Sequence, residues 1–470
     1  MGALGLSIAG TGLQAARDGM DAVAQNLANA NTPGYVSEQA QITASPTTDP
    51  LGIGSGAYVN GIAQASDAVL AADNLAASAS SASSSALQQT LSTVQAIFPE
   101  PGPNGLSSQL STFWSSWDSI ATNPSQIAPR TEVVNQAQDI ASTLNQEYAQ
   151  LSQTAANTNT QIASLASEVN TLFSQVASLN QSIVSSLASG SQPNALIDQR
   201  NNLVNQLGQD IGVTTRAQAN GSLDVYVGGF AMVQGNTADS LTVTSSGSPS
   251  TTSLVSKLAG LAVPVSGGTM SGLLTAVNTK IPQYQSQLDT VATDLANTVN
   301  TQLGNGWDAN ANTDVPAGTG VGPNGSAPLF TIPTSTTGAA GSTGAAADIA
   351  VNAAVVANPQ LLAAASSSTN GANDGSNAQA MAELGTSPTG PDQAYRNFIT
   401  NLGSDVQTTT SQSQAQQSLS QSLQASYQSV VGVNTDQQTV DMLAYQQAYQ
   451  ASAKVVSTVD AMVQSLLAAT

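Results

Sequence analysis

The chain has 470 residues, with 8 basic and 28 acidic side chains and a formal net charge of -20. Such a surface repels polyphosphates and anionic lipids, so we expect no nucleic-acid partner and no binding to an acidic membrane. Cysteine and histidine are both absent. This excludes disulfides, zinc sites built on thiolate or imidazole, and catalysis by Ser-His or Cys-His pairs. The sequence contains no run of about 18 apolar residues, so no transmembrane helix is expected.

A helix is predicted from about Leu4 to Ala30, and its apolar residues recur every seven positions. Heptad spacing favours packing against a second helix. The glycines at 5, 10, 12 and 19 each cost about 1 kcal/mol relative to alanine in a helix interior, so this helix should need neighbours, which the glycines would let approach closely. The first line of the pattern is Leu6, Leu13, Met20 and Leu27, and the second is Ala9, Ala16, Val23 and Ala30.

The same spacing returns in the last helix, which is predicted from Asn434 to Thr470 with Asn434 and Gln437 as a capping box. Leu443 lies beside its apolar seam, and Ser452 interrupts it. We interpret the stripes of both terminal helices as an assembly interface between subunits. In the last helix the interface residues are Met442, Leu443, Tyr445, Tyr449, Val456, Val459, Val463 and Leu466.

Between the ends, extended segments are expected over 36–62 and helix over 66–98. Further helices should fill 106–208, with breaks at Asn123-Pro124 and at 190–193. The period then changes to two in Leu223–Val227, which Gly228-Gly229 follows, so a hairpin is predicted. Helix should return over 273–303 and from Ala394 onward.

These patterns predict an α+β multidomain chain in which discontinuous terminal helical coiled-coil or bundle domains enclose inserted β-rich modules. The predicted terminal domain is 1–90 with 431–470. An elongated helical bundle is expected from 91–210 with 266–303 and 390–430, and outer β-rich modules from 211–265 and 304–389. A rod with both termini at one end follows from this order.

Three constellations have both a chemical and a plain structural interpretation. Asp308, Asn310, Asn312 and Asp314 are spaced like the start of a calcium loop, but threonines replace its glycine and glutamate, so a polar turn is expected. Asp198 and Arg200 are expected to form a structural ion pair. Trp114 and Trp117, three apart on a helix, are expected in the core and not as a sugar platform. We therefore predict no catalytic, cofactor or metal site, and no enzyme.

The segment Asn26–Tyr35 and the segment Gln446–Val456 resemble the shared ends of the axial proteins of the bacterial flagellum. Several interior segments are similar to the family of first hook-associated proteins, which join hook to filament: Asn123-Pro124-Ser125, the block Ile197–Val204, and Gly432–Asp436. The residues that carry the family motifs are Asn29, Asn31, Thr32, Pro33, Gly34 and Tyr35, and Asp198, Gln199 and Arg200. The chain departs from the pattern at Glu38, near which the family has a basic residue, and at Gln437 and Gln438, where it prefers acids.

The resemblance implies a structural subunit that self-assembles into a homo-oligomeric array, with the flagellar hook protein below it and the second junction protein above. It also implies type III export without a cleaved signal peptide, a cytoplasmic chaperone on the C-terminal helix, and an extracellular position at the hook–filament junction. Two alternatives stay open. One is a hook or distal-rod axial protein, and the other is a secreted adhesin or carbohydrate-acting protein, whose β region would need a ligand cleft.

Overall fold

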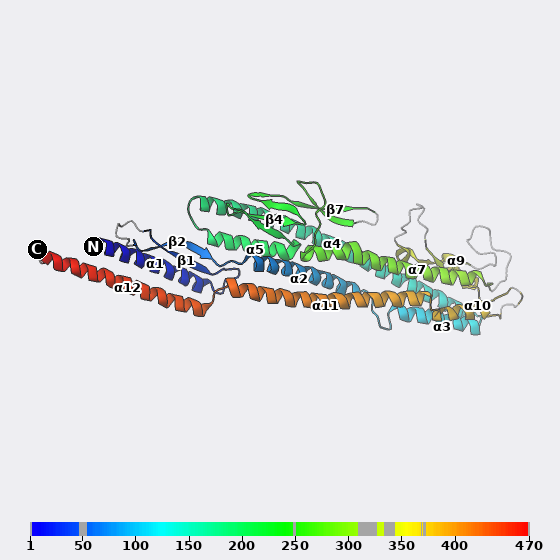
Figure 1. Cartoon of the computed structure of the whole chain (residues 1–470). Coiled ribbons are helices and arrows are strands. Elements are labelled where there is room, and N and C mark those ends of the chain that lie inside the picture. The colour runs from blue at the N-terminus through cyan, green and yellow to red at the C-terminus, as the bar shows by residue number, and fades with distance from the viewer. Residues whose placement is uncertain are drawn as a thin grey trace.

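The protein is a long rod with both termini at the same end, as the computed structural model shows (Figure 1). The structure describes residues 2–46, 54–247, 251–308, 327–332, 344–367, 369 and 373–468. Its long helices are α1 (Gly2–Asn29), α2 (Ala68–Gln95), α3 (Leu106–Thr122), α4 (Ile127–Ala188), α5 (Asn194–Ile211), α6 (Gly268–Thr275), α7 (Ile281–Gly304), α11 (Pro391–Val431) and α12 (Thr435–Ala468). The predicted α+β multidomain class is confirmed.

Proline and glycine end the helices where the sequence predicted. Asn123-Pro124 separates α3 from α4, and Gly190, with a φ of +82°, lies between α4 and α5. With 62 residues, α4 is roughly 93 Å long at 1.5 Å per residue and runs along most of the rod. A five-residue π-helix, Ala276–Lys280, connects α6 to α7. Within the described residues, no helix is long and apolar enough to cross a membrane.

Among the described residues, four small antiparallel sheets accompany the helices. The predicted hairpin is confirmed, because Gly228 and Gly229 both adopt positive φ between β4 and β5. The strands are β1 (Glu38–Ala44), β2 (Ala57–Gln64), β3 (Thr214–Ala217), β4 (Leu223–Val227), β5 (Phe230–Gln234), β6 (Thr237–Ala238), β7 (Leu241–Ser246), β8 (Thr251–Ser256), β9 (Phe330–Thr331) and β10 (Ala350–Val351).

The second predicted β-rich module, 304–389, contains more helix than strand in its described residues. Beside the two-residue strands β9 and β10, it contains α8 (Ala345–Asp348), α9 (Ala353–Ala357) and α10 (Ser376–Glu383). Alanine dominates these segments and bears neither the branching nor the aromatic ring that favours strands, so the composition pointed toward helix.

Asparagine side chains attach the strands to the helices by one repeated contact. In each case the amide nitrogen donates to the carbonyl oxygen of a strand residue, and the amide oxygen accepts from the N–H of that same residue, at 2.7–3.1 Å. The side chain thus satisfies backbone groups that a neighbouring strand would otherwise pair. The pairs are Asn26 with Glu38, Asn170 with Leu241, Asn180 with Leu223, Asn278 with Thr252, and Asn300 with Phe330.

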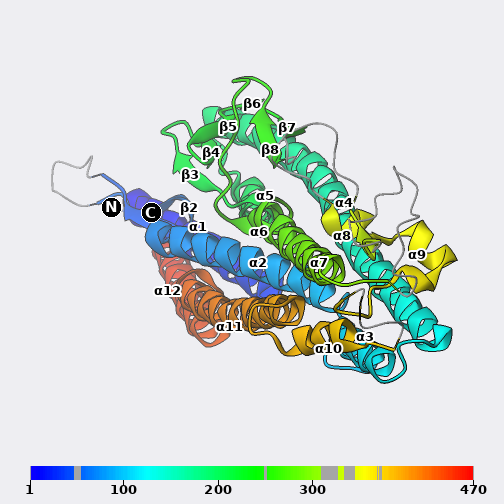
Figure 2. The ribbon, with the colours of Figure 1, turned by 90° about the vertical axis from the view of Figure 1, so that its right-hand side faces the viewer.

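Two hydrophobic cores hold the body of the rod together, and α2, α4, α7 and α11 run side by side through it (Figure 2). The core farther from the termini surrounds Phe113, Trp117 and Phe398, with parts of α2, α3, α4, α7 and α11. The nearer core gathers Phe173, Leu207 and residues of β4, β5 and α6. Trp114 and Trp117 are both buried, as the core interpretation predicted.

Candidate assembly interface

The two terminal helices pair antiparallel within one chain, as the heptads at both ends suggested. Their contact is made by glycines on α1, since a Cβ placed on Gly19 would lie 2.5 Å from the Tyr445 ring. A Cβ on Gly12 would lie 3.0 Å from Ser452 Oγ, and one on Gly5 would lie 3.9 Å from Val459. The glycines that weaken α1 as a lone helix therefore let α12 approach it closely.

This pairing corrects part of the sequence interpretation. Tyr445 and Val459 were expected to face neighbouring subunits, but they turn toward α1 of their own chain and are half-buried. On α1 the line Ala9, Ala16 and Val23 is buried as well. Small residues thus form the contact inside the chain, because only they let two helices come this close.

The larger apolar residues of α1 lie on its open face. Leu6 and Leu27 are each 46% exposed, and Leu13 and Met20 are half-buried. A soluble helix normally turns such side chains inward. Here they form a stripe with nothing of the described chain covering it fully.

The open face of α12 has a similar character. Leu443, Tyr449 and Val463 are exposed, whereas Met442 and Val456 are half-buried. The Leu466 side chain lies outside the described residues. Sequence reasoning missed four further exposed apolar residues, Val440, Val455, Met462 and Leu467. The seven-residue step from Val455 to Met462, one place before the Val456 line, was the available signal.

The turn after α1 is built by its own polar residues. Asn29 Nδ2 donates to the Gln25 carbonyl oxygen at 3.0 Å, and Thr32 Oγ1 donates to Asn29 Oδ1 at 3.2 Å. Gly34 has a φ of +77°, and a Cβ there would overlap the Asn202 side chain of α5. Asn31 and Pro33 are exposed. The motif therefore shapes the bend that brings the chain against α5.

Asn26, the first residue of this motif segment, is fully buried and makes four hydrogen bonds. Its Nδ2 donates to Glu38 O at 2.7 Å and to Gln438 Oε1 at 2.9 Å. Its Oδ1 accepts from Glu38 N at 2.8 Å and from the Tyr35 hydroxyl at 2.9 Å. One amide thus joins α1, the turn, β1 and α12. Asn26 follows Gly5, Gly12 and Gly19 at seven-residue spacing, and this polar residue at the end of a glycine line was the signal for it in the sequence.

The predicted ion pair between Asp198 and Arg200 is wrong, because residues two positions apart on the helix α5 do not face each other, and the two groups bind different partners. Asp198 Oδ1 accepts from Gln64 Nε2 of β2 at 2.8 Å. Burial raises the pKa of Asp198 to about 6, although hydrogen bonds from Gln64 and the Val36 backbone oppose the shift.

Arg200 binds toward the outer sheet and not toward Asp198. Its Nη1 donates to Gly221 O at 2.8 Å, in the turn before β4, and to Asn180 Oδ1 at 3.4 Å. Burial lowers the pKa of Arg200 to about 10. Gln199, between them, is exposed. The three-residue block therefore ties α5 to the terminal hairpin on one side and to the outer sheet on the other.

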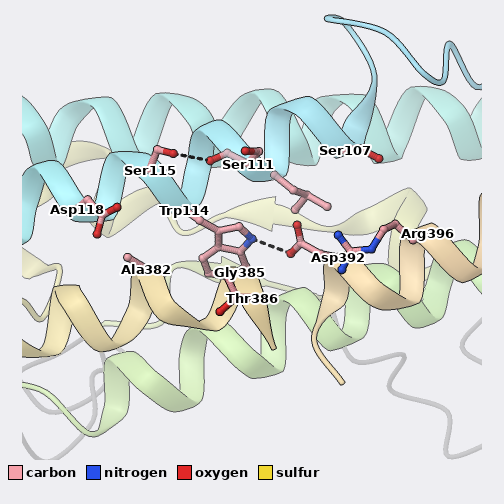
Figure 3. A pocket seen from close by; sticks show the side chains of 11 residues that line it. Ser107, Ser111, Trp114, Ser115, Asp118, Ala382, Gly385, Thr386, Asp392 and Arg396 are labelled. Carbon is pink, nitrogen blue, oxygen red and sulfur yellow. Dashed lines mark hydrogen bonds between the residues drawn. The ribbon is translucent and has the colours of Figure 1, made fainter. Parts of the chain in front are cut away.

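A pocket of about 320 Å³ lies between α3 and the start of α11 (Figure 3). The Trp114 ring at its base is 5% exposed, and Nε1 donates to Asp392 Oδ2 at 2.7 Å. Gly385 packs against the same ring, where a Cβ would lie 2.5 Å from Cδ1. The ring is therefore covered, and it offers no free face on which a sugar could stack.

The part of the chain that the structure describes contains no group of three or more acidic residues that could hold a metal ion. Of the calcium-like series only Asp308 is described; Asn310, Asn312 and Asp314 lie outside the described residues.

Three family models match separate parts of the chain. The "Flagellar hook-associated protein FlgK helical domain" matches residues 91–316, the "Flagellar basal body rod FlgEFG protein C-terminal" matches 424–469, and the "Flagella basal body rod protein" matches 6–35. The body and both terminal helices thus each match a flagellar family.

Curated relatives and a solved structure agree with these matches. The flagellar hook-associated protein 1 of Escherichia coli is 25% identical over 97% of this chain and 98% of its own length. That of Salmonella typhimurium is 26% identical over 64% of this chain and 57% of its own length. The flagellar hook junction protein FlgK from Burkholderia pseudomallei has a similar fold, with a TM-score of 0.62 at 19% identity, covering 76% of this chain and 99% of that one.

Proposed function

We propose that this chain, which belongs to the family of the flagellar hook-associated protein 1, acts by self-assembly through its terminal helices. It is a structural subunit of the bacterial flagellum that joins hook to filament. The observation that carries this mechanism is the contrast on α1, where small residues are buried and Leu6 and Leu27 are exposed.

The open faces of α1 and α12 are the proposed contact surface between copies. Fully burying a leucine or methionine side chain contributes roughly 1.5–3 kcal/mol. The stripe of Leu6, Leu13, Met20 and Leu27, with the exposed apolar residues of α12, offers several such contacts to a neighbour. Assembly would therefore supply the apolar environment that the paired helices lack alone.

The chain assembles with other flagellar axial proteins, and we propose the hook protein below it and the second junction protein above. We further propose type III export without a cleaved signal peptide, an extracellular position at the hook–filament junction, and a cytoplasmic chaperone that covers α12 before export. The chaperone would protect exposed residues such as Val440 and Leu443. The proposed mechanism involves no catalysis.

We propose domain limits that follow the packing. The first segment of the predicted terminal domain, which is 1–90 with 431–470, would end near residue 65 and not at 90, because α2 packs along α11 and α6. The bundle of 91–210, 266–303 and 390–430 would then include α2. The segments 211–265 and 304–389 remain outer modules, although the described part of the second contains more helix than strand.

A clean gene deletion tests the function. Cells without this protein should make hooks but no filaments and should shed filament subunits into the medium, and the intact gene supplied on a plasmid should restore filaments. Normal filaments in the deletion strain would contradict the proposal. A defect already in the hook or rod would favour the hook or distal-rod alternative, whose terminal motifs are shared.

A further inference from the structure

The contact between α1 and α12 consists of four layers at heptad spacing, and one layer differs chemically from the rest. In three layers a glycine of α1 faces a residue of α12, and in the fourth two amide side chains meet. The layers are Gly5 with Val459, Gly12 with Ser452, Gly19 with Tyr445, and Asn26 with Gln438.

The three glycine layers do not favour the native register over one shifted by seven residues. If α12 slid by seven residues, or about 10.5 Å, Tyr445 would meet Gly12 and Ser452 would meet Gly5. Both side chains would again face a glycine, while Val459 would move past Gly5, and the adjacent line of Ala9 and Ala16 is equally small. Unwinding two turns of α12 after the short linker 432–434 would supply the chain length for this slip.

The amide layer behaves differently because it is buried and because Asn26 makes four hydrogen bonds. Asn26 is 0% exposed and Gln438 is 8% exposed. In a slipped register Asn26 Nδ2 would lose Gln438 Oε1, its partner at 2.9 Å, and buried polar groups without partners are strongly disfavoured. A single buried asparagine sets the register of coiled coils in the same way.

We propose that Asn26 and Gln438 set the register of the terminal helix pair. Because Asn26 also binds Glu38 and the Tyr35 hydroxyl, it aligns α12 with the hairpin as well. A crevice of about 430 Å³ separates the hairpin from α12 nearby, so side-chain packing between them is incomplete and the amide links them. The register in turn decides which apolar residues of the two helices stand side by side on the open face.

Cysteine cross-linking of the purified full chain tests this directly, because the chain has no cysteine of its own. The native register is reported by Gly12→Cys with Ser452→Cys, whose Cβ atoms would lie 3.8 Å apart, a distance that suits a disulfide. The slipped register is reported by Gly5→Cys with Ser452→Cys, and by Gly12→Cys with Tyr445→Cys. Each pair is placed in the wild-type background and in two altered ones, Asn26→Leu with Gln438→Leu and Asn26→Ala with Gln438→Ala.

In the wild-type background only the native pair should cross-link efficiently. In either altered background the ratio of slipped to native cross-links should rise roughly tenfold or more, since the penalty on a slip is gone. Asn170→Leu is the matched control, because it removes the same kind of strand contact in the body and should leave the ratio unchanged.

Two results would overturn the proposal. Native cross-links alone in both altered backgrounds would mean that another feature sets the register. Loss of all cross-links in both would mean that the amides hold the helices together and do not select among registers. Because the assay uses the isolated chain, its outcome is independent of whether the protein joins hook to filament.

Discussion

The terminal unit (α1, the β1–β2 hairpin and α12) and the body of the rod differ in which side chains they bury. The body surrounds two large cores with whole aromatic and aliphatic side chains, such as Phe113 and Phe173. No described side chain of α1, β1, β2 or α12 belongs to either core. The terminal unit instead buries mainly alanines and glycines and leaves large side chains such as Leu6, Leu27 and Leu443 exposed.

This difference explains how one chain can be stable alone and still be built for assembly. Burial of a large side chain contributes far more than burial of an alanine, so the body holds its own fold. The terminal unit keeps its large side chains for neighbours. We therefore expect changes in the two regions to have separate consequences.

The largest expected effect is on assembly. Leu443→Asp with Val456→Asp should abolish incorporation into the flagellum, because an unpaired carboxylate in an assembled interface costs several kcal/mol. The melting of the body, measured by calorimetry, should hardly move. Gln447→Asp, on an exposed position of the same helix, is the control for added charge. Normal motility of the double variant in a complemented deletion strain would show that this face is not a contact surface.

A core truncation should do the reverse. Phe113 is fully buried, with ring centroids 4.9 Å from Trp114 and 6.2 Å from Trp117. Phe113→Ala should lower the free energy of unfolding of the body by about 3–5 kcal/mol, as measured by urea unfolding. Tyr58→Ala, on the exposed hairpin, is the control and should change it little. A loss below 1 kcal/mol for Phe113→Ala would contradict the core we describe.

The body also contains a buried acid that should make it sensitive to pH. Burial, aided by Glu100, raises the pKa of Glu147 to about 8. Between about pH 4.5 and pH 8 the folded chain keeps a proton that the unfolded chain has lost, so the free energy of unfolding should fall as pH rises, by up to about 1.4 kcal/mol per unit.

Glu147→Gln isolates this contribution. Its unfolding free energy should depend less on pH over that window than the wild type's, because glutamine does not titrate. Asp198 and Asp210, whose pKa values are also raised to about 6, contribute equally in both proteins. Urea unfolding at pH 5, 6.5 and 8 gives the comparison. Identical slopes for the two proteins would mean that Glu147 is ionised throughout.

The smallest expected effects come from two glycines of α1. A Cβ at Gly10 meets nothing within 4 Å, whereas one at Gly19 meets the Tyr445 ring. Gly10→Ala should therefore stabilise the helix by about 0.5–1 kcal/mol, and Gly19→Ala should open the pair. Circular dichroism during thermal melting compares the two. Equal effects of both substitutions would argue against the glycine contact.

Much of this organisation could be predicted from local patterns. The heptads at both ends, the breaks at Asn123-Pro124 and at Gly190, and the Gly228-Gly229 hairpin all reflect chemistry within a few residues. What sequence reasoning missed depends on contacts between distant segments. The heptads could not predict which line of residues on α1 contacts α12, because this depends on Gly19 of α1 meeting Tyr445, which is distant in the sequence. The i, i+2 spacing of Asp198 and Arg200 on a helix already argues against an ion pair, but it does not reveal their distant partners, Gln64 and Gly221.

Amide hydrogen exchange on a verified monomer tests the contrast between the two regions most directly. Exchange reports local opening, which is frequent where few large apolar side chains are buried. We predict fast exchange in 2–29 and 435–468 and strong protection in 106–208, where α3, α4 and α5 line the two cores. Strong protection of both terminal helices in the monomer would show that they are stable without neighbours and would contradict the account.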